Sequence, residues 1–247
     1  MNKLTILIST SPIPSNPKTI FIDAVINSIK KYLFIDNEYK IIIACDGTDE
    51  KNERYEKYIE NLKNKYKDNK NIFITVNKTK GHLSGNLRNA VQYAKTDFIL
   101  IVQHDLIFIS ESNPNLIIED MIKYPQLKHV RFNKRNNIKQ GWDNTPLYAS
   151  KKINGNYKYI MTEAWIDQNH ICRKNYFEDT VLGRCDRPTF MENILNRKAK
   201  GKHDEFGTFI LGDINEKNKI VHLDGAESRH GSAGQILKEN RLKYLDI

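Results

Sequence analysis

The sequence lacks any apolar run of the ~20 residues that a membrane-spanning helix needs, so we expect no membrane span. Its first apolar run, Leu4 to Ile8, is too short for the core of a signal peptide, and we expect no secretory leader. Cysteine is scarce. Cys45, Cys172 and Cys185 are odd in number and lack the spacing of a zinc site, which argues against a disulfide framework. These absences predict a cytoplasmic protein.

The positive charge of the chain is not concentrated in one place. A formal net charge of +9 comes from 39 Lys and Arg against 30 Asp and Glu, and the lysines are scattered. Nucleic-acid-binding proteins usually gather basic residues on one helix or interleave them with aromatic residues, and neither arrangement occurs here. The composition favours an anionic ligand in general and does not favour nucleic acid.

Internal repeats are absent too, and 247 residues can form one sizeable core, so we expect a single domain over residues 1–247. In residues 1–110, short apolar runs alternate with helical patterns. This predicts an α/β fold with a mainly parallel sheet flanked by helices. The expected strands are Leu4–Ser9, Lys40–Ala44, Ile72–Val76 and Phe98–Val102, and the expected helices cover about 20–33, 50–66 and 84–94.

The pattern changes in residues 111–247. The polar stretch from Asn133 to Tyr157 is long enough to be a functional loop. Around it we expect strands at 129–132, 159–165, 170–172, 209–211 and 220–223, and helices at 116–124, 174–181, 189–197 and 233–245.

Polar residues follow three of the expected strands: Ser9-Thr10-Ser11, Asp46-Gly47 and Gln103-His104-Asp105. Ligands of open parallel sheets bind beyond the carboxyl ends of the strands, so these groups should converge on one cleft. Asp105 ends an apolar run, and a carboxylate removed from water needs a cation or several hydrogen-bond donors. A divalent metal is a good partner for it.

Other residues at these positions allow two interpretations. Asp46 either caps the turn before the next helix or accepts a hydrogen bond from a pyrimidine base. Thr10 and Ser11 either belong to an ordinary loop or contact a base or ribose. Arg88-Asn89 either lies on a helix surface or receives a diphosphate near the start of a helix. The preceding glycines match neither the mononucleotide nor the dinucleotide loop.

The stretch from Gly85-Asn-Leu-Arg88-Asn89 through Asp97 to Gln103-His104-Asp105 resembles the nucleotide-binding half of inverting GT-A-fold glycosyltransferases of family 2, whose fold is Rossmann-like. Two earlier segments, 4–10 and 41–49, are also similar to that family, and the size of the chain is similar to that of small virus-encoded members. The resemblance implies a nucleotide-binding half (1–110) and an acceptor-binding half (111–247). It also implies that Thr10 and Asp46 contact the base, that Arg88 and Asn89 contact ribose and diphosphate, and that Asp105 holds a divalent metal.

One position departs from the family pattern. Gln103 replaces the first Asp of the family's Asp-x-Asp, so it can bind a ribose hydroxyl but brings no charge to a metal. His222, at the end of an expected strand, is a candidate for an additional ligand, and His230 is its rival. Imidazole suits Mn²⁺ better than Mg²⁺, although either ion fits the carboxylate.

An inverting transfer needs a base for the acceptor hydroxyl. The resemblance assigns this role to Glu192, in the place of the family's Glu-Asp motif, where Asn193 replaces the second carboxylate. Glu192 can also be a helix-entry residue favoured by the helix dipole, and Asp167 is the reserve candidate.

The sequence therefore predicts a metal-dependent glycosyltransferase of the hexosyltransferase type. It would move a sugar from a nucleoside diphosphate, most simply UDP, to a hydroxyl acceptor with inversion. One alternative is a sugar-phosphate nucleotidyltransferase, which would normally show a Gly-rich loop with Arg and Lys where this chain has Ser11-Pro-Ile-Pro-Ser-Asn16. Another is a non-catalytic module that binds carbohydrate or nucleic acid.

Overall fold

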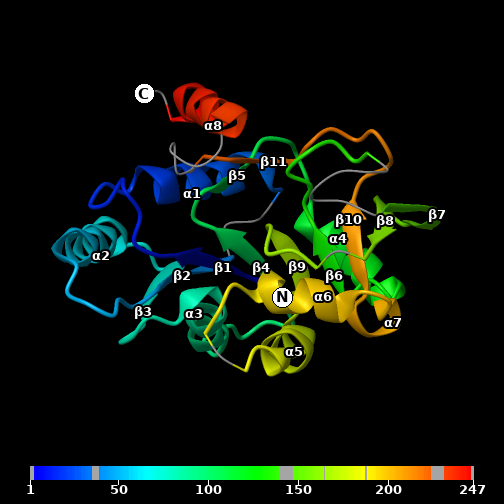
Figure 1. Ribbon diagram of the computed structural model, residues 1–247, viewed down its shortest axis with the longest axis horizontal. Coiled ribbons are helices and arrows are strands. Elements are labelled where there is room, and N and C mark those ends of the chain that lie inside the picture. Colours follow the sequence, from blue (N-terminus) through cyan, green and yellow to red (C-terminus); the bar gives the residue numbers. More distant parts are fainter. Residues whose placement is uncertain are drawn as a thin grey trace.

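The computed structural model describes residues 3–34, 39–138, 147–163, 165–186, 188–223 and 231–245. In this part of the chain a nine-stranded sheet carries helices on both faces (Figure 1). The strands lie in the spatial order β3 (Ile72–Val76), β2 (Lys40–Cys45), β1 (Leu4–Thr10), β4 (Phe98–Gln103), β9 (His170–Arg173), β6 (His129–Arg131), β10 (Thr208–Leu211), β8 (Lys158–Thr162) and β7 (Leu147–Asn154). A separate antiparallel pair consists of β5 (Leu106–Phe108) and β11 (Ile220–His222).

The helices of the described residues connect and cover these strands. They are α1 (Ile20–Tyr32), α2 (Glu53–Tyr66), α3 (His82–Val91), α4 (Pro114–Lys123), α5 (Lys174–Tyr176), α6 (Met191–Ala199), α7 (His203–Phe206) and α8 (Gly231–Tyr244). A π-helical turn, Phe177–Val181, and a 3-10 turn, Leu182–Arg184, extend α5.

The sheet is mixed but mainly parallel in direction. The four neighbouring strands β3, β2, β1 and β4 are parallel to one another. β9 and β8 are antiparallel to the strands beside them. The remaining strands, β6, β10 and β7, have the direction of β1. The expected α/β class with a mainly parallel sheet and flanking helices is therefore confirmed, and one continuous sheet runs through both halves of the chain.

Alternating side chains of the central strands supply the two faces of the core. Leu4, Ile6 and Ile8 of β1 pack with α1, α2 and α4, while Leu7 packs with α3, α6 and the turns after α5. Successive side chains of a strand point to opposite faces of the sheet. The continuous apolar run of β1 therefore supplies apolar side chains to both faces.

Two strands were not expected from the sequence. β5 follows β4 after a two-residue turn, and β7 lies inside the stretch 133–157 that the sequence predicts as a loop. β7 pairs with β8 through a register shift between Tyr148 and Lys152, so its polar side chains belong to an irregular edge strand. Residues 139–146 of that stretch lie outside the described residues, as does the alternative metal ligand His230.

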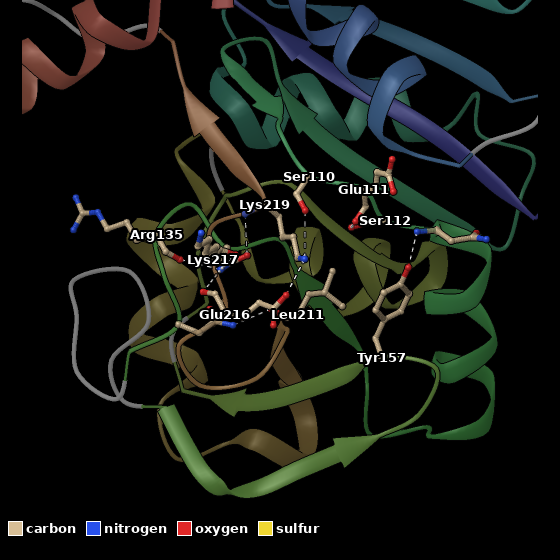
Figure 2. A network of polar contacts seen from close by, with 12 residues as sticks. Ser110, Glu111, Ser112, Arg135, Tyr157, Leu211, Glu216, Lys217 and Lys219 are labelled. Carbon is tan, nitrogen blue, oxygen red and sulfur yellow. Dashed lines mark hydrogen bonds and ion pairs between the residues drawn. The ribbon is translucent and has the colours of Figure 1, made fainter. Parts of the chain in front are cut away.

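The segment before β11 is held by a buried asparagine. Asn133 is fully buried, and its carbonyl and amide oxygens accept from the backbone N–H of Lys219 at 2.9 and 3.2 Å. Figure 2 shows the ammonium group of Lys219 between Glu216, at 3.0 Å, and Ser110, at 3.5 Å. These contacts fix the start of β11 against the segment that follows β5, and thereby position His222.

Candidate active site

A pocket of about 880 Å³ lies at the carboxyl ends of β1, β2 and β4, as expected from the polar residues after these strands. Its lining comes from segments that are far apart in the sequence. The lining residues are Ser9, Ser11, Pro12, Asp46, Gly47, Thr48, Asp49, Glu50, Lys51, Asn52, Lys80, His82, Leu83, Asn86, Gln103, His104 and Phe190. We call this cavity the first pocket.

Asp46 organises one wall of the first pocket. Its Oδ1 accepts hydrogen bonds from the backbone N–H groups of Gly47 at 2.9 Å and Gly81 at 2.8 Å. A side chain on Gly47 has no room, because a Cβ there would lie 2.3 Å from the carbonyl carbon of Thr79. The loop after β2 and the loop before α3 can therefore lie close together, because Asp46 bonds to both and Gly47 has no side chain. Asp46 is both a loop cap and a pocket residue.

The amino end of α3 faces the first pocket through His82 and Leu83. His82 has a φ of 48°, a left-handed conformation that costs a non-glycine residue energy and is found preferentially at functional sites. Its ring lies 6.0 Å from that of Phe190, which is 56% exposed. A helix amino end with unpaired N–H groups favours a negatively charged ligand.

Asn86 is a pocket residue that the sequence reasoning did not single out. It is almost completely buried, and its amide nitrogen donates to the hydroxyl of Ser9 at 3.0 Å and to the carbonyl of Ala44 at 2.7 Å. Its Oδ1 has no hydrogen-bond partner among the described residues. Asn86 thus ties α3 to β1 and β2 and leaves an acceptor atom for a ligand or water.

The structure brings Asp105 and His222 together. Nε2 of His222 lies 2.7 Å from Oδ2 of Asp105, while Oδ1 of Asp105 is buried without a partner in the described chain. Burial by itself raises the pKa of Asp105, but His104 and His222 outweigh it and lower this pKa to about 2. Asp105 is therefore ionised at neutral pH.

This pair fits a divalent cation. The 2.7 Å between Nε2 and Oδ2 is a hydrogen-bond distance, and a cation held by both atoms would replace this bond; two atoms that each lie ~2.1 Å from one ion at right angles are about 3 Å apart. The described residues contain no cluster of three or more His, Cys, Asp or Glu for a metal. Such an ion would need phosphate oxygens and water as further ligands, as is usual for metals that bind nucleotides.

α8 supports the metal-ligand candidate from behind. The side-chain amide of Asn240 donates to the carbonyl oxygen of His222 at 3.1 Å, and Nε of Arg241 donates to that of Leu223 at 2.7 Å. The C-terminal helix thus holds the strand on which His222 lies.

The two carboxylates proposed for proton transfer also lie side by side. The backbone N–H of Glu192 donates to Oδ2 of Asp167 at 3.1 Å, and that of Asp167 points to Oε2 of Glu192 at 3.4 Å. Burial, and then the charge of Glu192, raise the pKa of Asp167 well above its usual range. Gln103 links this pair to the first pocket, since its Nε2 donates to the carbonyl of Asp167 at 2.6 Å.

Glu192 is exposed and opens onto a second pocket of about 570 Å³. Four residues of α6, together with three residues outside it, line this second pocket. They are Lys134, Ile166, Glu192, Asn193, Asn196, Arg197 and Lys200. Phe190 of the first pocket precedes Glu192 by two positions, so the two pockets meet at the start of α6.

Three of the expected contact residues have hydrogen-bond partners away from the first pocket. Thr10 is buried, and its hydroxyl lies 3.0 Å from that of Tyr58 under α2. Arg88 donates to the carbonyls of Leu182 and Cys185 at 2.7 and 2.9 Å, so it holds the turns after α5. Asn89 donates to Oδ1 of Asn77 at 2.7 Å. Thr10, Arg88 and Asn89 do not line the first pocket, whereas Ser11, Asp46 and Gln103 do.

No family model matches the chain, and no curated protein does. Among solved structures it is similar to TarS from S. aureus, with a TM-score of 0.56 and 12% identity over 98% of this chain and 43% of TarS. It is also similar to the mannosyltransferase PcManGT from Pyrobaculum calidifontis in complex with GDP-Man and Mn²⁺, with a TM-score of 0.56 and 10% identity. That similarity covers 98% of this chain and 62% of the mannosyltransferase.

A nucleotidyl transferase from Methanothermobacter is similar as well, with a TM-score of 0.51 and 14% identity over 98% of this chain and 99% of that chain. The chain spans less than two thirds of the length of TarS and of the mannosyltransferase. At these identities the likenesses establish the fold, which is that of GT-A glycosyltransferases. No described helix is both long and apolar enough to cross a membrane.

Proposed function

We propose that the protein is a metal-dependent glycosyltransferase that moves a sugar from a nucleoside diphosphate to a hydroxyl acceptor with inversion. The observation that carries this proposal is the buried, ionised Asp105 with one unpartnered oxygen and His222 at 2.7 Å; neither residue lines the first pocket, but His104, directly before Asp105, does. A carboxylate and an imidazole in this arrangement suit Mn²⁺, with Mg²⁺ as the alternative. One GT-A neighbour was solved with GDP-Man and Mn²⁺.

The first pocket is the proposed donor site. Ser11 and Asp46 would contact the nucleoside, and the amino end of α3 would face the negatively charged part of the donor. Gln103 lies between this site and the carboxylate pair, where its remaining amide atoms can bind a sugar hydroxyl. We expect UDP as the nucleotide, because TarS was solved with UDP and with UDP-GlcNAc.

Glu192 would accept the proton of the acceptor hydroxyl. It is exposed at the mouth of the second pocket, whereas Asp167 is buried behind it. Burial and the charge of Glu192 raise the pKa of Asp167 and favour its protonated form, so we assign the base role to the exposed Glu192 and a supporting role to Asp167. The bound metal would stabilise the charge of the departing diphosphate.

The nucleotidyltransferase alternative shares the fold and is judged by the loop after β1. That chemistry places basic side chains on the triphosphate, but the loop of this chain is Ser11-Pro-Ile-Pro-Ser-Asn16 and contains no Arg or Lys. Oδ1 of Asn16 accepts a hydrogen bond from the backbone N–H of Ile13 at 2.9 Å, within the loop itself. The loop therefore forms a turn without basic side chains of its own for a triphosphate. This favours sugar transfer over nucleotidyl transfer.

Thermal-shift titration tests the proposal. UDP and GDP are added separately, with Mn²⁺ and with EDTA, to the wild-type chain and to Asp105→Asn. We expect one nucleotide to raise the melting temperature only with metal, and the variant to lose that response. Stabilisation by nucleoside triphosphates with release of pyrophosphate would support the alternative instead, and a response to oligonucleotides alone would contradict both.

A further inference from the structure

The second pocket has a charge pattern that the proton transfer does not use. Three of its lining residues are basic, namely Lys134, Arg197 and Lys200, and Glu192 is the one carboxylate among the described lining residues. Asp167 behind Glu192 lines neither pocket and is buried. Basic side chains therefore outnumber carboxylates among the described lining residues, at the side of the proposed base.

The polar lining forms one stripe on α6. Asn193, Asn196 and Arg197 follow the spacing i, i+3 and i+4, which places them on the same face of α6, and Lys200 directly follows the last residue of the helix. The opposite face, with Met191, Leu195 and Ala199, is buried in the core. A helix dipole favours cations at its carboxyl end, but it does not explain why Lys134, from the segment after β6, faces the same pocket.

Neither Arg197 nor Lys200 forms an ion pair or hydrogen bond with the described part of the chain, and both are exposed. Their charges are therefore available to a ligand. Ile166 adds an apolar surface, and the amides of Asn193 and Asn196 add neutral donors and acceptors. This combination suits a sugar that carries a negative charge.

We propose that the acceptor is a sugar with an anionic group, either a phosphate or a carboxylate, and that Arg197 and Lys200 bind this group. The proposal rests on the proposed function, since it assigns the second pocket to the acceptor. With a rise of 1.5 Å per residue, Arg197 lies about 7.5 Å along α6 from Glu192, and Lys200 follows the last residue of that helix. The anionic group would thus lie about one sugar ring from the reacting hydroxyl.

The test uses the full chain labelled with ¹⁵N and saturated with UDP and Mg²⁺, a diamagnetic ion that does not broaden the signals, so that the donor site is already filled. Glucose 6-phosphate, glucuronate and glucose are titrated separately, and the backbone amide signals of residues 193–200 are followed. We expect an anionic sugar to shift these signals and glucose to leave them unchanged at equal concentration. The phosphate and carboxylate arms then distinguish the two kinds of anionic group.

Two double variants make the comparison specific. Arg197→Gln with Lys200→Gln keeps hydrogen-bonding groups but removes two charges, and we expect it to weaken binding of the anionic sugar at least tenfold. Lys63→Gln with Lys67→Gln removes the same charge from exposed positions on and after α2 and should leave the affinity unchanged.

Equal shifts with glucose, absence of shifts with both anionic sugars, or unchanged binding by the α6 variant would overturn the anionic acceptor. The same spectra separate this failure from failure of the proposed function. If UDP and Mg²⁺ shift the signals of residues 46–52 and 80–86 while α6 gives no response, only the acceptor assignment fails. If UDP shifts neither segment, the donor site itself is wrong.

Discussion

Nε2 of His222 lies 2.7 Å from Oδ2 of Asp105, although 117 positions of sequence separate these two residues. The contact depends on β11, which pairs with β5 directly after Asp105 and places His222 opposite Leu106. The metal-site candidate is thus assembled by a small two-stranded sheet beside the main one, and α8 holds that sheet in place.

The first prediction concerns this pair. Asp105→Asn keeps the shape of the side chain and can still accept a bond from His222, but it removes the charge that attracts a cation. We expect the metal-dependent stabilisation by UDP to disappear. At a ligand concentration of about 100 times Kd, that stabilisation amounts to about 2.7 kcal/mol. The control is Asp68→Asn at an exposed position, which should respond to UDP and Mn²⁺ as the wild type does.

The second prediction separates the two carboxylates. Glu192→Gln should lower turnover by ~10²-fold or more, as is usual for the loss of a general base, while UDP binding stays the same. Asp167→Asn should change turnover little, because an amide resembles the protonated carboxyl and can still accept from the N–H of Glu192. Steady-state kinetics on a responsive acceptor check both. A severe loss in Asp167→Asn with normal turnover in Glu192→Gln would exchange their roles.

The third prediction concerns Arg88. In the structure this residue holds the carbonyls of Leu182 and Cys185, so Arg88→Ala should lower the free energy of unfolding by about 1–3 kcal/mol. The affinity for UDP should stay within twofold of the wild type, as measured by calorimetry at a temperature where both proteins are folded. A loss of UDP affinity without a loss of stability would return Arg88 to the donor site.

The main elements of the first half could be predicted because its strands are continuous apolar runs and their ends carry polar residues. The side on which each residue lies was harder to predict. Alternation along β1 places Ser9 and Ser11 on one side and Thr10 on the other, and this rule alone would have removed Thr10 from the pocket. The same kind of argument on α3 favours His82 and Asn86, which are four residues apart and both line the pocket.

Other features depend on contacts that no local pattern reveals. The partners of Arg88 lie 94 and 97 positions later in the sequence. β7 was predicted as loop because its lysines and register shift hide an alternation that leaves only Leu147 and Ile153 as buried apolar residues among its described side chains. Irregular, charged edge strands of this kind protect a sheet from pairing with other chains, and they weaken the sequence signal of a strand.

The fourth prediction compares two glycines near the first pocket. A Cβ at position 47 would lie 2.3 Å from backbone atoms of Thr79, so Gly47→Ala must push the two pocket loops apart and should weaken UDP binding at least tenfold. In Gly85→Ala the nearest atom, Cβ of Pro188, is 4.0 Å away, and alanine favours the helix by roughly 0.5–1 kcal/mol. This control should unfold at a slightly higher temperature and bind UDP normally. Equal UDP affinity in both variants would remove the 46–52 loop from the donor site.

The last prediction concerns pH and a buried pair of histidines far from the proposed metal. The rings of His129 and His170 lie 4.3 Å apart, and both side chains are fully buried. Burial lowers the pKa of His170 to about 4 and that of His129 well below its usual value, and the nearby Arg131 lowers both further. Both rings are therefore neutral in the folded protein near neutral pH.

As the pH falls, these histidines become protonated in the unfolded chain at a higher pH than in the folded protein. Their contribution to the free energy of unfolding is therefore complete above about pH 6.5 and decreases as the pH falls. Asp167 has the opposite effect, since its raised pKa makes the folded state bind a proton more tightly. The histidine contribution is isolated by subtracting the unfolding free energy of His129→Phe from that of the wild type at each pH. This difference should be constant above pH 6.5 and decrease steadily as the pH falls from 6.5 to 4.5, because the lowered pKa of His129 keeps the folded state from binding the proton that the unfolded chain binds. Urea unfolding at four pH values measures it, and a difference that does not change with pH would mean that His129 is not buried in its neutral form.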